Sequence, residues 1–169
     1  MSLLTILGKG LQAMIDEATT PESFKIGEQF ENYIRDNLFI DRYYDLIERT
    51  HNYRTNQHDY VLSSMRPDFT FRDRMTRKEI YVEAKFRTGL YQGKVEWCKD
   101  KQLLRYHEFN RERPTFLLIG MGNNPQKPNF VALVPMVKAR YTGLFPSFLK
   151  GFEIHVDEPV SSKKLWAKF

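Results

Sequence analysis

The spacing of apolar residues predicts a long helix near the start of the chain. Thr20-Pro21 offers an N-cap residue followed by proline at the first helical position. Small and apolar residues then recur at helical spacing and define one stripe, formed by Gly27, Phe30, Ile34 and Leu38. We therefore expect a helix from Pro21 to about Leu38 that buries this stripe.

The pattern changes to a period of two between residues 66 and 87. In Arg66–Arg72, Phe69 and Phe71 point to one face and Asp68 to the other. In Glu79–Arg87 the residues expected to face the core are Ile80, Val82, Ala84 and Phe86, and those expected to face away are Tyr81, Glu83, Lys85 and Arg87. A short polar turn joins the two runs, so they predict an antiparallel hairpin.

Later segments continue this alternation of helices and strands. The expected elements are a helix over Val95–Arg111, apolar strands over Thr115–Met121 and Phe130–Pro135, a short helix within Val137–Leu149 broken near Pro146, and a last strand over Phe152–Val156. The stretch Asp41–Ser64 is mixed, and Tyr43–Arg49 within it fits either a helix or a strand. The order predicts an α/β protein with a mixed central sheet flanked by helices.

Length and composition favour a single cytoplasmic domain over 1–169. The chain has 169 residues, 41% of them hydrophobic, which is enough for one core. We expect 1–20 to be an N-terminal helical extension and 157–169 a loosely attached basic tail. A lone cysteine, Cys98, allows no internal disulfide and fits a reducing compartment. No segment approaches the roughly 20 apolar residues of a membrane helix, so we expect no membrane association.

The predicted hairpin gathers side chains that suit a metal ion. Alternation places Glu83 and Lys85 on one face of their strand, and Asp68 lies on the preceding strand. The two acids can converge on one hard cation, with the Ala84 carbonyl as a third oxygen, and Mg²⁺ or Mn²⁺ fits such ligands. Such an ion would activate water and neutralise charge on a phosphate, with Lys85 beside it. A solvated Glu-x-Lys is the common alternative, and the joint pattern favours the site.

Here the sequence resembles a known group of enzymes. Arg66-Pro67-Asp68-Phe69 followed by Tyr81-Val82-Glu83-Ala84-Lys85 is similar to the signature of the PD-(D/E)XK nuclease superfamily, which includes type II restriction endonucleases and Holliday-junction resolvases. The resemblance implies a restriction-endonuclease-like core. It also implies that Asp68 and Glu83 are metal ligands and that Lys85 is the catalytic lysine.

Two further matches lie on the predicted helices. Gly27-Glu28-Gln29-Phe30-Glu31 is similar to a helix of resolvase-like and type IV restriction-like members, in which the matching acid is Glu31. Helical spacing also places Glu31 at the edge of the buried stripe and Glu28 further toward solvent. Glu31 would reach the metal directly, through water or at a second ion, or else remain a solvated side chain. Gln102, four residues before Tyr106, resembles a Gln-x-x-x-Tyr of the exonuclease-like branch and would face the active site.

The net charge of +5 is compatible with nucleic acid, and basic residues lie near the predicted site. The expected nucleic-acid contacts are Arg66, Arg87, Lys94, Lys99, Lys101 and Tyr106. We expect a Mg²⁺- or Mn²⁺-dependent nuclease that hydrolyses phosphodiester bonds, foremost in DNA. The alternatives are a non-catalytic nucleic-acid-binding module and an assembly module on the same fold. A homodimer is one way for so small a domain to cut both strands.

Overall fold

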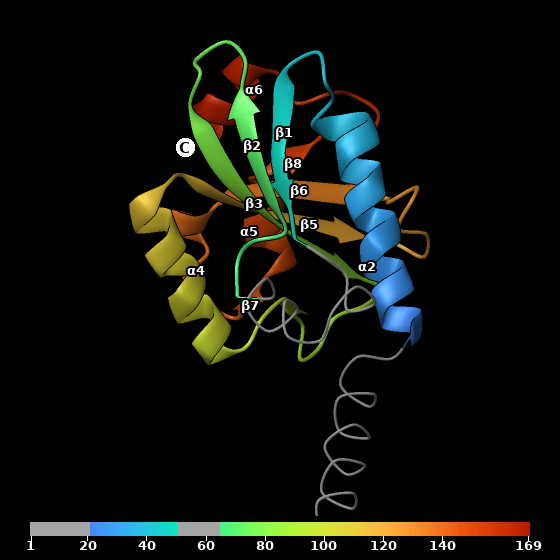
Figure 1. Cartoon of the computed structure of the whole chain (residues 1–169). Coiled ribbons are helices and arrows are strands. Elements are labelled where there is room, and N and C mark those ends of the chain that lie inside the picture. Colours follow the sequence, from blue (N-terminus) through green and yellow to red (C-terminus); the bar gives the residue numbers. More distant parts are fainter. Residues whose placement is uncertain (1–20, 51–64) are drawn as a thin grey trace, which may run out of the picture.

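The fold is built around one six-stranded sheet with the strand order β1-β2-β3-β5-β6-β8 (Figure 1). The computed structural model describes residues 21–50 and 65–169, so the expected N-terminal extension lies outside the described residues. The sheet strands are β1 (Tyr44–Arg49), β2 (Phe69–Asp73), β3 (Glu79–Arg87), β5 (Thr115–Met121), β6 (Phe130–Pro135) and β8 (Glu153–Ile154). The ambiguous segment Tyr43–Arg49 is thus a strand.

Helices and a small second sheet complete the structure. The helices are α2 (Pro21–Tyr33), α4 (Asp100–Glu112), α5 (Pro146–Lys150) and α6 (Ser162–Lys168), with a π-helical turn η1 (Ile34–Leu38) and a 3₁₀ turn η2 (Met136–Lys138). The second sheet pairs β4 (Val95–Glu96) with β7 (Gly143–Leu144). The predicted first helix does reach Leu38, because η1 continues directly from α2.

The sheet is mixed, as predicted. Strands β2 and β3 form the expected antiparallel hairpin, whereas β3 and β5 run parallel, because α4 carries the chain back across the sheet between them. The ranges predicted for β3, β5 and β6 are confirmed residue for residue. The protein therefore has the α/β architecture expected from its pattern.

Both faces of the sheet are covered, and each has its own apolar core. Helix α2, η1 and α6 cover one face, where Phe30, Ile34 and Leu165 are fully buried. Helices α4 and α5 and the β4–β7 ribbon cover the other (Figure 1). The expectation that Tyr81 and Glu83 face away from the core was wrong in one respect. They point to the opposite face, but α4 covers it, leaving them only 7% and 2% exposed.

Helix α4 begins at Asp100, five residues later than its pattern suggested. Val95 and Glu96 form β4 instead, with Val95 fully buried against the β7 strand. Gln102 Oε1 accepts a hydrogen bond from the Lys99 backbone N–H at 2.9 Å and so satisfies a donor at the start of the helix. Tertiary pairing thus sets this boundary, since the apolar spacing alone continues upstream.

The C-terminal region differs from prediction in two places. Pro146 begins α5 and does not break a helix, because proline suits a first helical position. The expected loose tail was also wrong: Leu165 of α6 is fully buried, and Asp73 accepts hydrogen bonds from Ser162 Oγ at 2.6 Å and Trp166 Nε1 at 2.7 Å. Within the described ranges, no helix has the length and apolar character to cross a membrane.

Candidate active site

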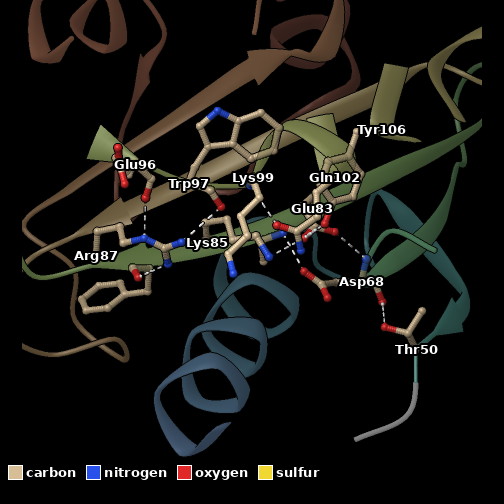
Figure 2. Close-up of polar contacts among 12 residues, drawn as sticks. Thr50, Asp68, Glu83, Lys85, Arg87, Glu96, Trp97, Lys99, Gln102 and Tyr106 are labelled. Atoms are coloured by element: carbon tan, nitrogen blue, oxygen red, sulfur yellow. Dashed lines mark hydrogen bonds and ion pairs between the residues drawn. The ribbon is translucent and has the colours of Figure 1, made fainter. Parts of the chain in front are cut away.

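Asp68 and Glu83 meet where β2 and β3 separate. The last paired residues are Phe69 and Val82, so both acids lie just beyond the end of the ladder. The Ala84 backbone N–H donates to Asp68 Oδ2 at 2.8 Å, and the Asp68 N–H donates to Glu83 Oε2 at 3.3 Å (Figure 2). Each carboxylate is therefore held by the backbone of the other strand, which brings the two acids together as the hairpin pattern predicted.

The second oxygen of Glu83 receives two further donors. Lys85 Nζ lies 2.6 Å from Glu83 Oε1, and the Tyr106 hydroxyl donates to the same oxygen at 2.5 Å (Figure 2). Glu83 is 2% exposed, and a carboxylate at this depth is tolerated only when it is paired and hydrogen-bonded. Tyr106 comes from α4, so this helix fixes the carboxylate from above the sheet.

The charges in this cluster influence one another strongly. Burial raises the pKa of Asp68 well above its ordinary value, the neighbouring Glu83 adds to the increase, and Lys85 opposes it. Burial alone would lower the pKa of Lys85, but Glu83 and Asp68 outweigh it and the net shift is upward. Lys85 is therefore held as an ammonium ion. The two carboxylates, for their part, favour any further positive charge placed between them.

Glu31 approaches the same cluster from α2. Its side chain is 16% exposed and forms an ion pair with Arg49 at 2.8 Å, whereas Glu28 is exposed, so the predicted orientations of the two acids are confirmed. Burial raises the pKa of Glu31; Arg49 opposes this shift and Glu83 contributes to it. Glu31 is therefore within electrostatic range of the site.

Arg49 is the residue of this region that the sequence did not indicate. It ends β1, donates to Glu31 and to Asn32 Oδ1 at 2.9 Å, and places its guanidinium 5.7 Å from the centre of the Phe69 ring. The next residue, Thr50, donates its N–H to the Asp68 carbonyl at 2.9 Å, and its hydroxyl donates to the same carbonyl at 3.4 Å (Figure 2). The end of β1 therefore positions both Glu31 and Asp68, and only the assignment of Tyr43–Arg49 as a strand would have suggested it.

The oxygen atoms at the site fit a hard divalent cation. The Ala84 N–H points toward Asp68, and because the N–H and C=O of one strand residue point to the same edge, its carbonyl lies on that side too. Asp68, Glu83 and this carbonyl are an all-oxygen set, which suits Mg²⁺ bound by one or two carboxylates and several waters. In the described part of the chain, no cluster of three or more His, Cys, Asp or Glu residues is arranged to hold a metal. Glu31 would have to leave Arg49 to become a third acidic ligand.

The two residues of the Gln-x-x-x-Tyr pair in α4, Gln102 and Tyr106, have different contacts. Tyr106 reaches Glu83, but the Gln102 side chain is used to cap the helix at Lys99. Tyr106 is only 2% exposed and stacks on Trp97, with ring centres 5.6 Å apart. The expectation that Tyr106 contacts nucleic acid does not fit this burial, and the structure places it behind the carboxylate instead.

Arg87 also has a different position from the one expected. Its guanidinium donates to the carbonyls of Phe86 at 2.8 Å, Glu96 at 2.6 Å and Trp97 at 3.1 Å (Figure 2). These bonds attach β4 to β3 and leave few N–H groups for a phosphate. We therefore correct the expected role of Arg87 from nucleic-acid contact to structural support.

The other basic candidates lie nearer the surface. Lys99 and Lys101 are exposed, and Arg66 is exposed with an ion pair to Glu48 at 3.1 Å. Lys94 Nζ lies 5.0 Å from the centre of the Phe145 ring. These side chains remain predicted nucleic-acid contacts, since their accessibility is compatible with binding a phosphate.

Comparison with protein-family models and with curated proteins adds no relative to this picture. No protein-family model matches the chain, and no curated protein matches it significantly. Function is therefore inferred from the chemistry of Asp68, Glu83, Lys85 and their surroundings.

Proposed function

We propose that this protein is a metal-dependent nuclease with a restriction-endonuclease-like core, which hydrolyses phosphodiester bonds in DNA. The observation that carries the proposal is the convergence of Asp68 and Glu83 beyond the last β2–β3 pair, with Lys85 Nζ 2.6 Å from Glu83. Burying the Glu83 carboxylate, with a half-buried acid and a half-buried lysine held against it, is costly for folding. A catalytic use of the charges offers a reason for the cost.

The metal ligands in this proposal are Asp68, Glu83 and the Ala84 carbonyl. A bound Mg²⁺ or Mn²⁺ ion would supply positive charge for the phosphate and lower the pKa of a coordinated water. Tyr106 would keep Glu83 in the orientation that the ion requires, because its hydroxyl fixes one carboxylate oxygen. The Ala84 N–H would do the same for Asp68.

Lys85 would act as a hydrogen-bond donor. Its pKa is raised by Glu83 and Asp68 against the effect of burial, so it retains its proton and is a poor general base. The ammonium group can orient the attacking water and bind a non-bridging phosphate oxygen. The water oxygen would form a bond to phosphorus as the bond to the leaving sugar oxygen breaks. The attacking water would give one proton to solvent, and the leaving oxygen would take one from solvent.

The proposal is tested by a cleavage assay on labelled single-stranded, duplex and branched DNA. With Mg²⁺ or Mn²⁺ the wild type should cut at least one of these, and chelation should stop it. Asp68→Asn should lower the cleavage rate by roughly 100-fold or more. Substituting a residue that only hydrogen-bonds to a metal ligand already lowers metal affinity or activity by about 10- to 100-fold.

Asp41→Asn is the matched control. Asp41 is exposed and lies just before β1. The first residue of β1, Tyr44, pairs with Asp73 at the end of β2, whereas Asp68 lies at the other end of that strand. This variant should cut as the wild type does. Equal cleavage by wild type and Asp68→Asn would contradict the proposal, as would the absence of cleavage with either metal.

A further inference from the structure

A second feature lies beside the proposed active site, on the α4 face of the sheet. It is a groove of about 870 Å³ between the β4–β7 ribbon, the start of α4, and α5. The turn before β4 contributes Tyr91 and Lys94 to its lining, and these two residues form a short bridge. We refer to it below as the ribbon groove. None of the residues Asp68, Glu83 or Lys85 lines it, so it is separate from the metal ligands.

Aromatic side chains of the ribbon groove are unusually exposed. Tyr141 is 72% exposed, Tyr91 59% and Phe145 54%, while Phe148 lines the same groove with partial burial. Soluble proteins rarely expose several large aromatic rings in one place, and where they do, the patch is commonly a binding surface. The flat faces of such rings suit flat ligands.

Positive charge lies among these rings. The groove is lined by the basic residues Lys94, Lys138 and Arg140 and by the acids Glu96 and Asp100. Lys94 Nζ is 5.0 Å from the centre of the Phe145 ring, so an ammonium group and an aromatic face lie side by side. Among the residues that the structure describes, neither Lys138 nor Arg140 forms an ion pair.

Direct contacts connect the ribbon groove to the proposed active site. Trp97 Nε1 donates to the Tyr141 carbonyl at 2.8 Å, and the Trp97 ring stacks on Tyr106. Tyr106 in turn donates to Glu83. Figure 2 shows Trp97 and Tyr106 close to Glu83 and Lys85. The groove is therefore held in a fixed position relative to the carboxylates, on the same face of the sheet.

We propose that the ribbon groove binds unpaired nucleotides of a DNA strand. Bases would stack on Tyr141 and Phe145, and phosphates would pair with Lys138 and Arg140. Alternating aromatic faces and cations are the means by which proteins hold single strands without reading sequence, whereas the bases of a duplex already stack on each other. The inference rests on the proposed function, and it narrows the substrate to DNA with an unpaired segment beside the cut.

The test measures binding without cleavage. Fluorescence anisotropy in EDTA compares a short labelled oligo(dT) with the same strand annealed to oligo(dA). The wild type should bind the single strand more tightly. Tyr141→Ala and Phe145→Ala should each weaken its binding by roughly 5- to 100-fold. Lys138→Ala and Arg140→Ala should each lower the slope of log affinity against log salt by about one.

Two control variants separate stacking from folding. Phe169 is 54% exposed, as Phe145 is, but lies outside the groove, so Phe169→Ala should bind normally. Tyr141→Phe keeps the ring and should also bind as the wild type does. Thermal unfolding of each variant confirms that it is folded.

The inference is overturned if Tyr141→Ala and Phe145→Ala bind oligo(dT) as the wild type does, or if duplex is bound as tightly as single strand. It is also overturned if these variants only dissociate a dimer, since the occupant is then a second copy of the chain. A failure of the proposed function gives a different result. If no metal supports cleavage, but binding in EDTA still depends on Tyr141 and Phe145, the inference about the groove is supported and the proposed nuclease activity is contradicted. Conversely, if cleavage depends on Asp68 but binding does not depend on Tyr141 or Phe145, only the inference about the groove is contradicted.

Discussion

Glu83 is a carboxylate in the middle of a buried strand, and the groups around it determine what it can do. Lys85 Nζ and the Tyr106 hydroxyl contact one oxygen, and the Asp68 N–H contacts the other. The three donors come from β3, α4 and the residue just before β2. A side chain fixed from three directions is pre-organised, which is what a metal site requires.

Removing the Tyr106 hydroxyl tests this pre-organisation. Tyr106→Phe should weaken Mn²⁺ binding or cleavage by roughly 10- to 100-fold, because Glu83 loses a donor that orients it. Isothermal titration with Mn²⁺ and the cleavage rate are the measurements. Tyr81→Phe is the control, since its hydroxyl donates to Glu112 at 3.2 Å on the same face but outside the site. The role given to Tyr106 would be contradicted if Tyr106→Phe and Tyr81→Phe changed Mn²⁺ binding and cleavage equally, or if neither variant changed them.

At this scale the sequence predicted the acids better than their partners. Alternation along Glu79–Arg87 placed Glu83 and Lys85 on one face, and the structure agrees. The hydrogen bond of Tyr106 and the ion pair of Arg49 with Glu31 join residues from separate elements. Such contacts depend on how α4 and β1 pack against the sheet, and local periodicity carries no information about that.

At the scale of elements, a buried carboxylate of the sheet binds α6 in addition to the burial of Leu165. Asp73, the last residue of β2, accepts hydrogen bonds from four groups: Ser162 Oγ, Trp166 Nε1, Thr76 Oγ1 and the Met75 N–H. Burial alone would raise the pKa of Asp73, but these donors outweigh it and hold the pKa below its ordinary value. Docking of α6 should therefore depend on the ionised form.

The sign of the pH effect follows from this lowered pKa. The stability contributed by Asp73 is fully present above its unfolded pKa of about 3.8 and is lost as pH falls through the folded value. Asp73→Asn should lower the free energy of unfolding by about 1–3 kcal/mol at neutral pH, and the difference from wild type should shrink below the unfolded pKa. Urea unfolding over a pH series measures it, with the exposed Asp41→Asn as control. A difference that grows toward acid pH would contradict this account.

Element boundaries were predictable where burial is periodic and failed where distant residues set them. The strands β5 and β6 are buried on both faces, and their apolar runs end where the strands end. The alternation of polar and apolar residues delimits β3 in the same way. The start of α4 depends on the pairing of β4 with β7, and the docking of α6 depends on Asp73, far away in the sequence. Neither contact leaves a local pattern, so the helix start and the attached tail were both mispredicted.

At the scale of the whole molecule, the covered sheet explains where a reactive cluster can lie. Helices shield both faces, and the antiparallel ladder of β2 and β3 ends at Phe69 and Val82. Beyond that pair the backbone groups of β3 are no longer used by β2, and Asp68 takes the Ala84 N–H instead. The site therefore lies where β2 and β3 separate, and the Glu83 side chain points to the face of the sheet that α4 and the β4–β7 ribbon cover.

A crystal soaked in Mn²⁺ tests the central claim most directly. Anomalous difference density should appear between the Asp68 and Glu83 carboxylates and the Ala84 carbonyl. A crystal of Asp68→Asn soaked in the same way should show no density there, because a neutral amide replaces one of the two negatively charged ligands. A saturated wild-type crystal with no peak between these three groups, or with its only peak elsewhere, would contradict the account.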